Sequence, residues 1–109
     1  SLLGRLIMKY KVAYNACYGG FSLLPEVSIY LNEHYGLDIN PNYGYIDEKL
    51  VPRHHRGLIE AIELFKDKAS GSLANLCIAH IDSPTYRIDE YDGFEAVKTP
   101  QTYDWVVIN

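Results

Sequence analysis

The chain has 109 residues and a net charge of -4 at pH 7, which suits one domain with one hydrophobic core. An acidic chain without a stripe of basic residues is a poor binder of nucleic acid, and no apolar run approaches the roughly 18 to 20 residues that span a bilayer. We therefore expect neither a nucleic-acid partner nor membrane insertion. Two cysteines, Cys17 and Cys77, form neither a disulfide framework nor a zinc pattern, so we expect reduced thiols, no metal and no cofactor.

The N-terminal part of the chain predicts a strand and a tight turn. Residues 1–7 precede Met8 without a periodic pattern, and we interpret them as a leader or extension before a single domain, 8–109. Residues 9–17 alternate with the two-residue period of a strand. The pair Gly19-Gly20 then turns the chain, because glycine takes positive φ without a steric penalty.

Two helices are expected. The first spans 24–35, with Pro25 suited to its first turn and Gly36 to its end. The second spans 55–69, where apolar residues recur on one helical face before Gly71. The segment between the helices, 38–52, is rich in turn-forming residues and predicts a loop.

The C-terminal half predicts further strands. Residues 73–81 carry apolar side chains on both faces, which is typical of a central strand with Cys77 buried. Residues 86–91 alternate again, and we expect them to form an antiparallel hairpin with 73–81. A fourth strand, 94–98, would follow a bulge at Gly93, and the apolar tail 103–108 is expected to dock. The predicted fold is α+β: a three- to four-stranded mixed or antiparallel sheet with two helices packed on one face.

Cys17, Gly19 and Gly20 are the first ligand-binding candidates, because they lie where the first strand meets the first helix. A thiol near a helix N-terminus can be stabilised as a thiolate, and a histidine base could make it a nucleophile. The spacing selects none of the four candidates for that base, which are His34, His54, His55 and His80. A lone cysteine is more often structural, so we interpret this corner as mainly architectural and keep Cys17 as a catalytic candidate.

Arg53, His54, His55 and Arg56 form a short basic cluster ahead of the second helix. Guanidinium and imidazolium groups suit a phosphate or a carboxylate, so these four residues are further ligand-binding candidates. The alternative is a solvated loop in which basic charge at a helix N-terminus is tolerated. Adjacent histidines are poor zinc ligands, because the ligands of a zinc ion converge from separated positions.

The acidic segment near the C-terminus fits no EF-hand, and we interpret it as a solvated hairpin. Its members are Asp82, Asp89, Glu90, Asp92 and Glu95. Within it, Tyr91, Asp92 and Gly93 form a structural motif, with Asp92 and Gly93 as turn and bulge residues.

Two segments carry a resemblance to a known family. They are Cys17-Tyr18-Gly19-Gly20-Phe21-Ser22-Leu23 and Ile88-Asp89-Glu90-Tyr91-Asp92-Gly93-Phe94-Glu95, with Arg53-His54 and Lys68-Ala69-Ser70-Gly71 around the second helix. With these, the chain resembles small uncharacterised proteins of tailed phages and large DNA viruses over 8–97. The resemblance implies a viral or prophage origin, and it implies no activity.

Our main hypothesis is a small viral accessory protein in the host cytoplasm that binds without catalysis. Its partner would be a host protein or a small anionic ligand, as for a counter-defence factor. The ten tyrosines favour an interaction surface and leave a homo-oligomer open. The alternatives are a cysteine-dependent enzyme that uses Cys17, and a virion or assembly component.

Overall fold

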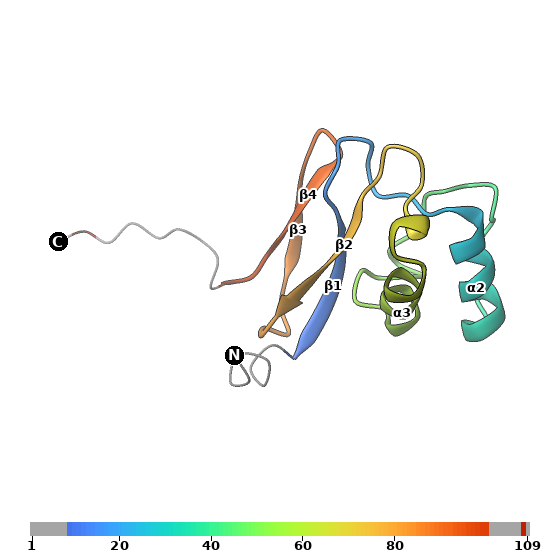
Figure 1. The fold of residues 1–109 in the computed structure, drawn as a ribbon. Coiled ribbons are helices and arrows are strands. Elements are labelled where there is room, and N and C mark those ends of the chain that lie inside the picture. The colour runs from blue at the N-terminus through green and yellow to red at the C-terminus, as the bar shows by residue number, and fades with distance from the viewer. Residues whose placement is uncertain (1–8, 101–107, 109) are drawn as a thin grey trace.

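The structure is a computed structural model that describes residues 9–100 and residue 108. The strands lie on one side of the domain and the helices on the other (Figure 1). In chain order the elements are β1 (Tyr10–Asn15), α2 (Pro25–Tyr35), α3 (Arg56–Phe65), the 3-10 turn η1 (Lys66–Ala69), β2 (Leu76–Ile81), β3 (Arg87–Tyr91) and β4 (Phe94–Lys98). Helix α3 contacts β1 and β2, and α2 packs against α3 on the side away from the strands. The predicted leader, 1–7, and all of the predicted docking tail except Ile108 lie outside the described residues.

The expected α+β class with two helices is confirmed, and the four strands form two antiparallel two-stranded sheets. β1 pairs with β2, so that Tyr10 lies opposite Ile81 and Asn15 opposite Leu76. β3 pairs with β4. The predicted hairpin of 73–81 with 86–91 is therefore wrong, and β2 is not a central strand. Cys77 on β2 is half-buried rather than buried.

Backbone conformation explains the pairing of β3 with β4. Asp92 and Gly93 both have positive φ, at 51° and 83°. Two consecutive residues of this kind form a two-residue hairpin turn whose twist matches the flanking strands. Gly93 is thus the second turn residue and not a bulge, and the chain folds back directly from β3 into β4.

The helices lie close to the predicted ranges. Gly36 ends α2 in the left-handed conformation, with its N–H donating to the Asn32 carbonyl. α3 begins after His55, whose side chain accepts from the backbone N–H groups of Gly57 and Leu58. Histidine thus caps this helix in the way that serine or aspartate usually does.

One hydrophobic core fills the space between α2, α3 and the β1–β2 sheet. Its fully buried members come from β1, both α-helices, the loop before α3 and η1: Ala13, Val27, Leu31, Val51, Leu58, Ala61 and Ala69. The predicted amphipathic pattern is confirmed over α3, because Leu58, Ala61 and Ile62 face this core. The α-helix ends at Phe65 and not at residue 69. The core fixes α3 beside β1, and this places the residues just before α3 next to the first strand.

Candidate functional site

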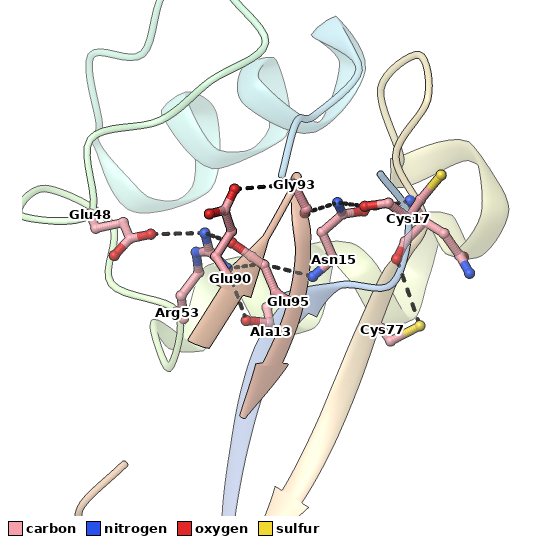
Figure 2. Close-up of polar contacts among 10 residues, drawn as sticks. Ala13, Asn15, Cys17, Glu48, Arg53, Cys77, Glu90, Gly93 and Glu95 are labelled. Atoms are coloured by element: carbon pink, nitrogen blue, oxygen red, sulfur yellow. Dashed lines mark hydrogen bonds and ion pairs between the residues drawn. The ribbon is translucent and has the colours of Figure 1, made fainter. Parts of the chain in front are cut away.

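A buried ion pair joins Arg53, which lies ahead of α3, to Glu95 on β4 (Figure 2). Two parallel hydrogen bonds form it, Nη1 to Oε1 at 2.6 Å and Nη2 to Oε2 at 2.8 Å. The side chains are 6% and 8% exposed. The Arg53 guanidinium also lies 3.9 Å from the Phe21 ring centroid, and its Nη2 contacts the exposed Glu48 carboxylate at 2.8 Å. The Arg53 guanidinium is thus shielded from water and contacts a second carboxylate and an aromatic ring in addition to Glu95.

This ion pair joins β4 to the edge of β1 that faces away from β2. On that edge, the Asn15 backbone N–H donates to Glu95 Oε1 at 2.8 Å, and the Ala13 N–H donates to the Arg53 carbonyl at 2.8 Å. Arg53 Nη1 also donates to the Ala13 carbonyl, at 3.4 Å. Backbone groups of an interior strand normally find a neighbouring strand. Here the Arg53 backbone and two charged side chains take that place.

Asn15 connects the ion pair to the two turns on which the viral resemblance rests. Its side chain is fully buried and donates to the carbonyls of Cys17 at 2.6 Å and Gly93 at 2.8 Å. Its Oδ1 accepts from the Asn75 N–H at 2.8 Å. A side chain on Gly93 would lie 2.2 Å from the Tyr18 carbonyl oxygen. The Gly-Gly corner and the β3–β4 turn are therefore in direct contact. Asn15 and Gly93, which form the hydrogen bond between them, lie 78 residues apart in sequence.

Two pockets of the described part of the chain are relevant to function. The smaller, of about 320 Å³, lies over the ion pair. Its lining includes Gly20, Tyr45, Glu48, Arg53, Glu90 and Glu95. The lining thus contains three carboxylates and one guanidinium, so the pocket is acidic. The Arg53 guanidinium is already bound by two of them, Glu48 and Glu95.

The larger pocket, of about 560 Å³, lies between the start of β1, the first turns of α3 and the loop between β2 and β3. Its walls are Lys9, Tyr10, Lys11, Val12, His54, Arg56, Ile59, Glu60, Glu63, Ile81, Ser83, Pro84 and Tyr86. Lys11 contacts Glu63 at 2.9 Å, and Arg56 contacts Glu60 at 3.0 Å. The wall thus has three permanent cations against two carboxylates.

Two aromatic groups shape one side of the larger pocket. His54 Nδ1 and the Tyr86 hydroxyl lie 2.7 Å apart, and their rings meet edge to face. Burial raises the pKa of Tyr86, and the nearby Glu48 charge raises it further. The hydroxyl is therefore protonated at neutral pH and can share a hydrogen bond with the imidazole.

Glu60 is held in its ionised form. The Tyr35 hydroxyl donates to Glu60 Oε2, and Arg56 Nε donates to Oε1. The hydrogen bond from Tyr35 is the main cause that lowers the pKa of Glu60, and the bond from Arg56 adds to it. The Glu60 carboxylate thus holds Arg56 at the pocket rim through its Nε, while the Tyr35 hydroxyl holds the carboxylate itself in place.

The structure divides the predicted basic cluster. Arg53 lies in the interior, whereas His54 and Arg56 line the larger pocket. His55 caps α3 and lines neither pocket. Of the residues at the Gly-Gly corner, Gly20 lines the smaller pocket, and Cys17 and Gly19 line neither.

Sequence reasoning missed several residues of these sites. The prediction that Glu95 belongs to a solvated hairpin is wrong, because this residue is buried, at 7% exposure, and paired with Arg53. Asn15 and Glu48 gave no signal in the sequence. Lys9 and Lys11 did give a signal, because two lysines on the same face of the predicted strand form a local basic surface.

Cys17 is half-buried, and among residues 9–100 no histidine side chain hydrogen-bonds its thiol. The four candidate bases have other environments: His34 stacks on Tyr30, His54 contacts Tyr86, His55 caps α3, and His80 lies opposite Lys11 at the far end of β1. The described part of the chain also holds no group of three or more side chains suited to a metal ion. No helix in that part is long and apolar enough to cross a membrane.

Searches for related proteins found no match to this chain among protein-family models, curated proteins or solved structures.

Proposed function

We propose that this protein is a viral accessory protein that binds a small anionic ligand in the larger pocket without catalysing a reaction. The observation that carries the proposal is the pocket wall itself, which combines Lys9, Lys11 and Arg56 with the rings of Tyr10 and Tyr86. The viral origin rests on the resemblance of the Gly-Gly corner and the β3–β4 turn.

Charge supports an anion as the ligand. Glu60 and Glu63 each contact one cation of the wall, and no contact of this kind involves Lys9 among the described residues. Arg56 is 86% exposed and uses only Nε toward Glu60. Its two Nη groups are therefore free to donate side by side, which is the geometry that recognises carboxylate and phosphate.

The size and lining of the pocket support a small molecule with an apolar or aromatic part. A volume of about 560 Å³ falls within the range of roughly 300 to 1,000 Å³ that is usual for small-ligand sites. The lining includes the buried apolar side chains of Val12 and Ile59 and the aromatic side chains of Tyr10 and Tyr86. An anion with a flat or apolar body could therefore place its charge at Arg56 and its body against the tyrosines.

The test is a thermal-shift panel of inorganic phosphate, nucleotides and metabolite carboxylates, followed by titration calorimetry on each hit. We expect at least one anion to raise the melting temperature. Loss of one charge-assisted hydrogen bond, worth about 1.5 to 3 kcal/mol, should weaken its binding tenfold or more in Arg56→Gln. Lys68→Gln is the matched control, because Lys68 is exposed on η1 and lines neither pocket.

A second experiment addresses the host-protein partner. Pull-down from host lysate should be repeated with Arg56→Gln and Lys68→Gln as baits. A partner lost only with Arg56→Gln would place a host protein at this pocket instead of a small anion. No hit in the panel together with no captured partner would disprove the proposal.

A further inference from the structure

We infer that β2 of one copy pairs with β2 of a second copy, so that two domains share one continuous sheet. This inference is independent of the proposed ligand. It rests on the outer edge of β2, which has no strand beside it in the described part of the chain. The inner edge of β2 pairs with β1 over its full length (Figure 1).

The hydrogen-bonding pattern of β1 shows which backbone groups of β2 face outward. Ala13 and Asn15 direct their N–H groups away from β2, toward Arg53 and Glu95. Backbone N–H and C=O groups point alternately to the two sides of a strand, so the residues of β1 on either side of Ala13 bond to β2. Ala13 lies opposite Ile78, and this pair is therefore not hydrogen-bonded. The backbone N–H and C=O groups of Ile78, and of His80 two residues later, consequently point away from β1. Neither residue makes another backbone hydrogen bond within the described part of the chain.

The two outer edges of the strand layer differ in how they are protected. β3, on the far side of β4, carries Arg87, Asp89 and Glu90, and charged side chains keep a sheet edge from pairing with other chains. β2 reads Leu-Cys-Ile-Ala-His-Ile and has no permanently charged residue, no proline and no bulge. Of the two outer edges that the described strands form, the β2 edge is therefore the one without charged side chains that would keep another strand away.

The chemistry of β2 favours a second copy as its partner. A two-fold antiparallel pair about Ala79 sets Ile78 of each copy opposite His80 of the other, so that all outward N–H and C=O groups of these two residues bond. Each Cys77 then lies opposite Ile81, and each Asp82 opposite Leu76. No like charges face one another, although the whole chain is acidic.

The pairing can be tested by light scattering coupled to size exclusion over a range of concentrations. The full chain should approach twice its mass of 12.4 kDa as concentration rises. His80→Pro should remain a monomer, since it removes an outward N–H and leaves the β1 ladder intact. His80→Thr keeps that N–H and should still dimerise. A single mass of one chain at all concentrations would overturn the inference, as would a dimer that His80→Pro leaves unchanged.

A crosslink tests the register independently. In a Cys17→Ser, Cys77→Ser background, Ala79→Cys places two thiols on the two-fold axis, where Cα atoms of a non-hydrogen-bonded pair lie about 4.5 Å apart, within disulfide range. Mild oxidation should give a covalent dimer. The matched control is Ala96→Cys on β4, which should stay monomeric. Dimers that crosslink equally at both positions, or at neither, would show that β2 is not the interface. Should His80→Pro fail to fold, this crosslink decides the question.

Discussion

Arg53 and Glu95 lie 42 residues apart in sequence and meet in the interior through two parallel hydrogen bonds. The pair replaces a backbone ladder between β1 and β4, because Glu95 accepts from the Asn15 N–H and Arg53 donates to the Ala13 carbonyl. A buried charge is costly without its partner, so the pair couples the position of the β3–β4 hairpin to the segment that leads into α3.

Glu95→Gln should destabilise the fold strongly. The substitution keeps the shape of the side chain, but among the described residues it leaves the 6% exposed guanidinium with the exposed Glu48 as its one remaining counter-ion. Breaking a buried ion pair in this way costs about 3 to 5 kcal/mol. Urea denaturation followed by circular dichroism measures the loss.

Glu48→Gln is the control for this prediction, because Glu48 contacts the same guanidinium and is 57% exposed. An exposed ion pair contributes about 0 to 1 kcal/mol. Equal losses in the two variants would show that the interior pair has no special part in stability.

Gly93→Ala should destabilise more than Gly36→Ala, although both glycines have positive φ, at 83° and 64°. A left-handed residue other than glycine costs about 1 to 2 kcal/mol, and this is all that Gly36 should lose, since nothing lies within 4 Å of its added Cβ. At Gly93 the added carbon would also meet the Tyr18 carbonyl oxygen at 2.2 Å. Paired denaturation curves test the difference, and equal losses would argue against contact between the corner and the hairpin turn.

Stability should fall in acid partly through Glu60. Its folded-state pKa is lowered, mainly by the Tyr35 hydroxyl and then by Arg56, so the unfolded chain binds its proton first as the pH falls. The contribution of Glu60 to the free energy of unfolding is present at neutral pH. It is lost as the pH falls through the ordinary pKa of the carboxyl group and then through its lowered pKa in the folded state. The stability difference between the native chain and Glu60→Gln should therefore shrink from pH 7 to about pH 3.

NMR titration of the Glu60 carboxyl carbon gives a direct check. Its midpoint should move upward in Tyr35→Phe, because that substitution removes the largest cause of the lowered pKa. A midpoint that does not move would show that the Tyr35 hydroxyl does not bond to Glu60 in solution.

Cys17 should react with a thiol probe at neutral pH no faster than a model peptide thiol. Within the described residues no histidine hydrogen-bonds its thiol, and its backbone carbonyl accepts from the Asn15 side chain. The rate is measured in a Cys77→Ser background, with Cys17→Ser as the matched control. Reaction well above the peptide rate would restore the cysteine-dependent enzyme as the better hypothesis.

Short-range sequence signals predicted most helices and strands of this fold. The helices α2 (25–35) and α3 (56–65) follow from Pro25, Gly36 and an apolar face, and β1 follows from its alternation. The predicted second helix runs four residues too far, because residues 66–69 form the separate 3-10 helix η1. These signals act between residues a few positions apart, where backbone sterics and side-chain period are already set by the sequence. Even here His55 was not expected as a cap, because its role depends on a side-chain rotamer and not on residue type.

The sequence by itself determined the α+β class, the helices and the turns, because glycine, proline and hydrophobic periodicity act over short distances. Only the tertiary structure decided which strands pair, that Glu95 is buried against Arg53, and that His54 and Arg56 face a different pocket from Arg53. These outcomes depend on how the core places α3 beside β1. A charged side chain in a sequence gives no sign of the partner that packing will bring to it from 42 residues away.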